Sequence, residues 1–185
     1  LVGDFTDSRM LDLQYALETL GAMTMPIGTD ASAADIDRIL SVIVPDTVIV
    51  WENLLSPVAA ALQEKRIMLH RLVTVGARVM PQEETRAISG NFARGHVHLY
   101  TDAVLGALIA GGAIGGMRID AEQFFAEALD AAGAGHTEDG AAGELVLSTI
   151  AAEAMPVLRY RTGRAVRFVR RAASGSTSEL YITEG

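Results

Sequence analysis

Short apolar runs alternate with helix-like patterns over the first half of the chain, and this alternation constrains the fold more than any other feature. Residues 47–51 are continuously apolar or β-branched, as buried strands are, and residues 71–75 are predicted to form another strand, which ends at Gly76. Residues 7–20 repeat apolar side chains at helical spacing and stop at Gly21. Strands and helices that alternate through short connections form a parallel sheet covered by helices on both faces. The predicted helices are 7–20, a helix from Thr29 or Asp30 as cap to about Leu40, 54–63 and 81–89; the predicted strands are 22–25, 47–51, 71–75 and 96–100.

The second half of the chain has a different pattern. Helical connections become rare, and Gly and Ala dominate the turns, so a more antiparallel, barrel-like β subdomain is expected. Residues 133–143 are predicted to be a Gly/Ala-rich loop, and residues 124–130 are ambiguous because they favour a helix locally. The predicted fold class is therefore α/β, with an α/β subdomain at 1–114 and a smaller β-rich subdomain at 115–185. Its predicted strands are 117–119, 144–149, 166–169 and 180–182.

Composition excludes several classes of function. The chain has no cysteine, so neither disulfides nor thiolate chemistry is available. Its net charge of -8 argues against a nucleic-acid partner. No run reaches the roughly 18 apolar residues of a membrane span, and nothing resembles a signal peptide, so a cytoplasmic protein without a membrane partner is expected. Lys65 is the single lysine, and therefore the one candidate for lysine chemistry.

The most specific sequence motifs lie at residues 144–150, with the sequence ELVLSTI, and at residues 154–163, with the sequence AMPVLRYRTG. This text resembles GELVLTTL and AMPLIRYRTGD of the AMP-forming acyl-adenylate enzymes, in the phenylacetate–coenzyme A ligase branch. Residues 116–130 are similar to that family's GLHVWEDHFYPEIID, so the resemblance implies a strand at 124–130. Residues 20–28, 75–81 and 175–185 are similar to its LGATVIPAG, its FGAEPW and its hinge GRTDDMLIIRG.

The resemblance implies a two-step reaction. A carboxylate attacks the α-phosphate of ATP to give an acyl adenylate, and coenzyme A then takes the acyl group as a thioester. Mg²⁺ and cationic donors offset the repulsion between the anionic reactants. The substrate would be a small aryl or acyl carboxylic acid lying near Trp51, Gly76 and Tyr100. The resemblance places the phosphate loop before residue 1, and the mobile C-terminal domain with its catalytic lysine after residue 185; Lys65 lies in the wrong segment to replace it.

Several positions that match the nucleotide site carry unexpected residues. The segment that holds the family's magnesium acid has lost it, and Asp102 is a displaced substitute. Arg78 replaces the acid of FGAE, and Arg164 replaces the aspartate that accepts hydrogen bonds from both ribose hydroxyls. Because an arginine has only donors, it cannot copy that role. Ser176 replaces the arginine of GRTDD. By family position the nucleotide-binding residues are Gly76, Ala77, Arg78, Tyr100, Thr101, Asp102, Arg164 and Ser176, whereas Trp51 and Gly76 would line the substrate pocket.

These substitutions leave two functions open. The chain is either part of an acyl- or aryl-CoA ligase with a degenerate nucleotide site, or a non-catalytic relative that acts as a binding or assembly partner. If the chain is part of a ligase, ATP or AMP, Mg²⁺ and coenzyme A are the cofactors. If it is a non-catalytic relative, it need not bind any cofactor. No catalytic residue is assigned and no resident metal is predicted. A homodimer or a partner protein is expected, since surface left open by missing domains favours association.

Other features have two readings each. A run of arginines between Arg159 and Arg171 could bind phosphate or an acidic partner, or form a solvated strand edge. His96 and His98 could bind metal, although no third ligand is evident. Trp51 could line a pocket or pack in the core. Glu127 is expected to face outward, and Gly111, Gly112, Gly115 and Gly116 are expected to form turns and tight packing, since no helix start with Lys or Ser/Thr follows them.

Overall fold

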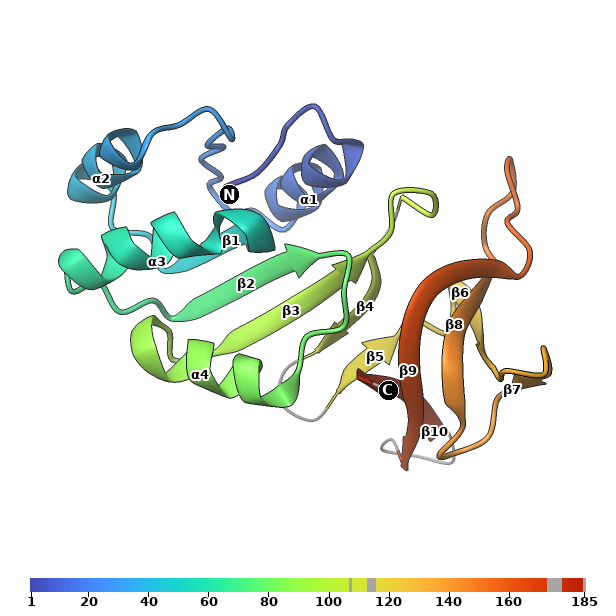
Figure 1. Ribbon diagram of the computed structural model, residues 1–185. Coiled ribbons are helices and arrows are strands. Elements are labelled where there is room, and N and C mark those ends of the chain that lie inside the picture. The colour runs from blue at the N-terminus through green and yellow to red at the C-terminus, as the bar shows by residue number, and fades with distance from the viewer. Residues whose placement is uncertain (107, 113–115, 173–177, 185) are drawn as a thin grey trace. The chain divides into compact units, whose positions relative to one another are not determined.

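The computed structural model describes residues 1–106, 108–112, 116–172 and 178–184. Within it the chain forms two compact units. The first comprises residues 1–76 and 85–97, and the second comprises residues 77–84 and those from 98 onward. The fold class is α/β with strands that pair partly parallel and partly antiparallel, as expected (Figure 1). The subdomain division at 114/115 stays a prediction.

The first unit contains the parallel pairing that the alternating pattern predicts. β1 and β2 run parallel from Thr47 opposite Arg71 to Trp51 opposite Val75. The first residues of the chain extend this pairing, because the Val2 amide donates to Ile49 (2.8 Å) and the Trp51 amide donates to Val2 (3.1 Å). The elements are α1 (Ser8–Thr19), α2 (Ala33–Val42), β1 (Thr47–Trp51), a 3-10 turn (Glu52–Leu54), α3 (Leu55–Glu64), β2 (Arg71–Gly76) and α4 (Gln82–Phe92).

One apolar core joins helices α2 and α3 to these strands. Ile36 of α2 and Leu62 of α3 belong to the same buried cluster as Val50 of β1 and Leu72 of β2. Each fully buried side chain of this size contributes about 1.5–3 kcal/mol to folding. The alternation of apolar and helical segments is thus explained by burial on the sheet.

Two local predictions in this unit are wrong. Residues 22–25 form no strand; only Ile27 makes an isolated bridge, to Val2. The reason is that the apolar residue Met23 is 93% exposed, and Pro26 has no amide hydrogen for a ladder. The cap of α2 is Ser32 rather than Thr29 or Asp30, because Ser32 and Asp35 form a reciprocal capping box.

The second unit is an antiparallel sheet, as the sequence predicts for the second half. Residues 124–129 form a strand despite their helical propensity, because they pair with residues 144–149 along their whole length. Tertiary pairing therefore overrides the local preference. The strands of this unit follow the order β3 (His96–Thr101, from His98), β4 (Leu108–Gly112), β5 (Met117–Ile119), β10 (Ser178–Glu184), β9 (Tyr160–Ala172), β8 (Ala142–Thr149), β6 (Phe124–Leu129), β7 (Gly135–His136).

The glycine cluster is explained in part. Gly111 and Gly112 lie within β4 rather than in a turn, and a side chain at Gly112 would come within 2.3 Å of the Gly116 carbonyl oxygen. Tight packing is therefore the reason for glycine at 112, whereas Gly115 lies outside the described residues. Among the described residues, no helix has the length and apolar content that a membrane crossing requires.

The arginine run lies on an interior strand. β9 sits between β10 and β8, so the reading of a solvated strand edge is wrong. Arginines of the run contact acids on neighbouring strands: Arg159, just before β9, pairs with Glu127 (3.1 Å), and Arg161 of β9 pairs with Glu144. Glu127 is consequently held at the sheet surface and is largely covered, its side chain being 16% exposed.

A histidine holds the hairpin between β6 and β7. His136 donates from Nε2 to Asp130 (3.0 Å) and from Nδ1 to Glu138 (3.1 Å), and two donating nitrogens require a protonated imidazole. The hydrogen bond to Asp130 raises the pKa of His136 above its ordinary value, with the charge of Glu138 acting in the same direction. The imidazole in turn lowers the pKa of Asp130. This triad makes the hairpin sensitive to pH.

We predict that the stabilisation from His136 is complete below about pH 6.5, the ordinary pKa of histidine, and is lost as the pH rises through the higher pKa in the folded state. The free energy of unfolding in urea is measured for the wild type and for His136→Gln. The difference between the two should be larger at pH 5.5 than at pH 8.5. A difference that stays constant over this range would show that His136 does not titrate against its two carboxylates.

A second prediction concerns a close backbone approach. A side chain at Gly143 would come within 2.2 Å of the Leu129 carbonyl oxygen on β6, so Gly143→Ala should destabilise the protein by about 1–3 kcal/mol. Gly90 in α4 has open space around it, so the matched variant Gly90→Ala should stabilise it by about 0.5–1 kcal/mol. Urea unfolding measures both. Equal effects of the same sign would contradict the β6–β8 packing.

Candidate functional site

The carboxyl end of β1 carries a packed aromatic ring. Trp51 is half-buried, and a side chain at Gly3 would come within 2.1 Å of its indole ring. The guanidinium of Arg9 lies over the ring at 4.8 Å from its centroid, a cation–π contact. Trp51 is thus enclosed by Gly3 on the chain's first strand-like segment and by Arg9 on α1.

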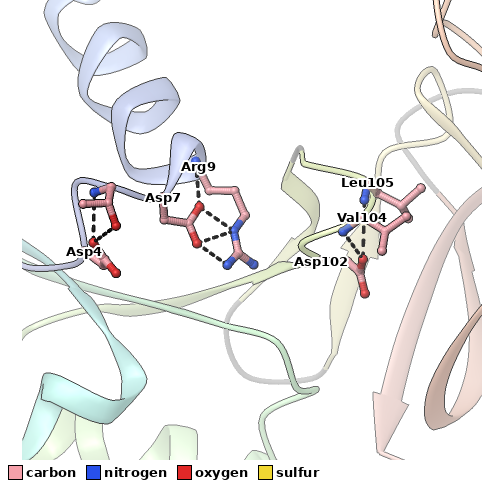
Figure 2. Close-up of polar contacts among 7 residues, drawn as sticks. Asp4, Asp7, Arg9, Asp102, Val104 and Leu105 are labelled. Atoms are coloured by element: carbon pink, nitrogen blue, oxygen red, sulfur yellow. Dashed lines mark hydrogen bonds and ion pairs between the residues drawn. The ribbon is translucent and has the colours of Figure 1, made fainter.

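Arg9 is positioned by the start of α1. Asp7 caps this helix by accepting the Arg9 amide (2.9 Å), and the same carboxylate accepts Nε of Arg9 at 2.9 Å and its Nη2 (Figure 2). These hydrogen bonds lower the pKa of Asp7. The sequence analysis did not assign Arg9 or Asp7 to the site. The pattern that could have indicated them is a helix-capping aspartate followed two positions later by an arginine.

Glu52 is a further acid that sequence reasoning did not assign. It follows β1 directly, and a side chain at Gly76 would come within 1.9 Å of its carboxylate oxygen. The end of β2 must therefore be glycine to leave room for the Glu52 carboxylate. Trp51 and Gly76, the two predicted pocket residues, thus end paired parallel strands of the first unit.

In the second unit, Arg78 is committed to structural contacts. Its guanidinium donates to both carboxylate oxygens of Glu84, at 2.9 and 2.6 Å. Its carbonyl accepts Nε2 of His98 (2.9 Å), and burial lowers the pKa of this histidine. His96 of the first unit shares a hydrogen bond with Thr74 (2.9 Å). Each imidazole therefore has a partner within its own unit.

Asp102 shapes the turn after β3. Its Oδ1 accepts the amides of Val104 (2.8 Å) and Leu105 (3.4 Å), as Figure 2 shows. Its Oδ2 accepts the hydroxyl of Tyr160 at 3.4 Å. A carboxylate that accepts three internal donors is a turn-forming group, and this role explains an acid at this position without a metal.

Four of the predicted nucleotide-site residues gather at the end of β3. Tyr100 is fully buried, and burial raises the pKa of its hydroxyl. Asp102 and Arg164 act on the same hydroxyl in opposite directions, the carboxylate raising its pKa and the guanidinium lowering it. Thr101 is also buried, and Ala77 and Arg78 belong to the same unit. Ser176 lies outside the described residues.

Asp102, the acid that the sequence offers for Mg²⁺, is used by the protein itself. The described residues contain no group of three histidine or acidic side chains arranged to hold a metal. Both oxygens of Asp102 already accept hydrogen bonds, whereas Mg²⁺ is held through carboxylates and waters. No metal-dependent step is therefore assigned to this residue.

Comparison with known proteins gives the fold its class. No family model and no curated protein matches the chain. A solved structure of 2-hydroxyisobutyryl-CoA ligase in the postadenylation state, in complex with R3-HIB-AMP, is similar over 100% of this chain and 42% of that chain, with a TM-score of 0.81 and 16% identity. A benzoate CoA ligase from Burkholderia xenovorans LB400 is similar over 85% of this chain and 35% of that chain, with a TM-score of 0.55 and 12% identity.

These similarities establish the fold. The chain has the α/β architecture found in acyl- and aryl-CoA ligases, and it spans less than half the length of those chains. The N-terminal subdomain of Klebsiella oxytoca NpsA, in complex with 3-hydroxybenzoyl-AMSN, is also similar (TM-score 0.53, 10% identity, 86% of this chain and 47% of that chain). The resemblance drawn from the sequence is thus confirmed at the level of the fold.

We predict that Asp102 has a structural role. Asp102→Ala removes the acceptor for two backbone amides and should lower the free energy of unfolding by about 0.5–2 kcal/mol. Asp102→Asn retains an amide oxygen that can accept them and should cost less. Urea unfolding compares the two variants, and calorimetry with MgCl₂ should give the same heats for the wild type and Asp102→Asn. Loss of magnesium binding in Asp102→Asn would instead identify the acid as a metal ligand.

Proposed function

We propose that this chain is part of a protein related to the ATP-dependent acyl- and aryl-CoA ligases, with an altered nucleotide site. The observation that carries the proposal is the similarity of the entire chain to 2-hydroxyisobutyryl-CoA ligase at a TM-score of 0.81. The sequence motifs at 144–150 and 154–163 support the same relationship. In such a protein ATP or AMP and coenzyme A would be the partners of a small carboxylic acid.

The substrate class that we propose is an aryl or acyl carboxylic acid, and the motifs favour the phenylacetate–coenzyme A ligase branch. Trp51 offers an aromatic surface at the carboxyl end of β1, where parallel sheets bind their ligands. Arg9 covers one face of that ring, while its charge is paired with Asp7. Glu52 beside Gly76 limits the space at the end of β2.

The ribose and metal positions do not fit the ligase chemistry. Arg164 stands where the family's ribose acceptor stands, and a guanidinium has only donors. Asp102 is occupied by internal hydrogen bonds. A single charge-assisted hydrogen bond is worth about 1.5–3 kcal/mol, so the loss of two such positions would weaken adenylation by orders of magnitude.

The second candidate is a non-catalytic relative that acts as a binding or assembly partner, as a homodimer or with another protein. The commitment of Asp102 and Arg78 to internal contacts favours it. Exposed apolar side chains also favour it, since such surface promotes association. Met155 and Leu158, on the connection from β8 to β9, are 81% and 76% exposed.

We predict that exchange of pyrophosphate into ATP, measured with a panel of aryl and fatty acids and millimolar magnesium, stays near the blank. The reason is the loss of the ribose and metal contacts. Arg164→Asp, which restores the acceptor, should raise exchange if the rest of the adenylation site is present. Robust exchange by the wild type with any acid would reject the non-catalytic candidate and establish the adenylation step.

A further inference from the structure

The arginines of β9 differ in what their side chains contact. Arg164 is exposed, and within the described part of the chain its guanidinium makes no hydrogen bond or ion pair. The other four arginines of β9 have partners, which are Glu144 for Arg161, the Gly140 carbonyl for Arg167, the Thr137 carbonyl for Arg170 and the Tyr181 ring for Arg171. Arg159, which precedes the strand, pairs with Glu127. Arg164 is therefore the member of the run that the sheet itself does not use.

A bulge in β9 sets the position of Arg164. Glu144 faces Ala165 and Val146 faces Arg161, so Leu145 alone lies opposite residues 162–164. The bulge is fixed by hydrogen bonds: the Thr162 hydroxyl donates to the Leu145 carbonyl (2.8 Å), and the Gly163 amide donates to the Glu144 carboxylate (3.0 Å). Gly163 has a φ of +69°, a left-handed conformation that favours glycine. Bulges re-aim a side chain relative to the sheet.

The acceptors near Arg164 are already used. Asp102 accepts two backbone amides and the Tyr160 hydroxyl. Glu144 accepts Arg161 and the Gly163 amide. Tyr160, at the start of β9, donates its hydroxyl to Asp102 (3.4 Å), so this part of β9 lies beside the turn that follows β3. Among the described residues, the two carboxylates named above, Asp102 and Glu144, already accept hydrogen bonds from the protein, whereas the Arg164 guanidinium offers donors to a ligand.

We propose that Arg164 makes this site select a nucleotide whose ribose carries a phosphate monoester over one with a free ribose diol. A guanidinium fork binds a phosphate through two parallel hydrogen bonds. Dinucleotide-binding folds show the same change of side chain with ligand. In some an acid binds a ribose hydroxyl, and in others an arginine accommodates a phosphate on the ribose. The inference rests on the proposed nucleotide-binding role of the site.

The test is calorimetric titration of the 185-residue chain with AMP, adenosine 2′,5′-bisphosphate and adenosine 3′,5′-bisphosphate. The wild type should bind one of the bisphosphates at least about tenfold more tightly than AMP, as one charge-assisted contact allows. Arg164→Asp should lose this preference and bind AMP more tightly than the wild type does. Arg164→Gln should lose the preference without gaining affinity for AMP.

Arg167→Asp is the matched control, because it makes the same change of charge on the same strand at a residue that donates to Gly140. It should retain the preference, and circular dichroism should show that all three variants are folded. Inorganic phosphate should bind the wild type more weakly than the preferred bisphosphate does. The inference would be overturned if inorganic phosphate bound the wild type as tightly as the preferred bisphosphate, or if Arg167→Asp lost the preference. It would also be overturned if AMP bound as tightly as both bisphosphates, or if no nucleotide bound at all.

Failure of this inference can be distinguished from failure of the proposed function. Pyrophosphate exchange with ATP in the absence of any preference for a bisphosphate would support a ligase reaction and reject the role of Arg164. A preference that depends on Arg164, in the absence of exchange with every acid, would support the role of Arg164 and reject adenylation by this chain.

Discussion

The Glu144 carboxylate is the interaction on which the shape of the candidate nucleotide site depends. It accepts the Arg161 side chain and the Gly163 amide, and so it satisfies a backbone donor that the bulge removes from the ladder. The Thr162 hydroxyl satisfies the Leu145 carbonyl from the other side of the bulge. The presence of Glu144, Thr162 and Gly163 in this segment is thus explained by the hydrogen-bonding needs of the backbone.

The same principle accounts for the acids and cations near the strand ends. Asp7 holds Arg9, Glu84 holds Arg78, and Asp102 holds the turn after β3. Each group is charged, yet each has internal partners. A charged side chain is therefore weak evidence for catalysis when its hydrogen bonds are all made within the protein. Among the described arginines of β9, Arg164 is the one whose guanidinium makes no such hydrogen bond.

Sequence patterns predicted the buried strands well because burial acts on many residues at once. Residues 47–51 were predicted to their exact ends, and residues 124–129 required the family resemblance because their own propensity is helical. The errors occurred where one local contact decides the outcome. The Ser32–Asp35 capping box moved the start of α2, and exposure of Met23 prevented a strand at 22–25. The interior position of β9 could not be predicted, because strand order depends on pairing between distant segments.

The bulge separates two properties that usually change together in a protein. Its backbone shape depends on residues 144, 162 and 163, whereas the chemistry that it offers to a ligand depends on the side chain at 164. Because that side chain is exposed and supports no neighbour, a change there carries little penalty for folding. Exchange of aspartate and arginine at this one position therefore replaces acceptors by donors while the architecture persists, and relatives with the same frame would then differ in what they recognise.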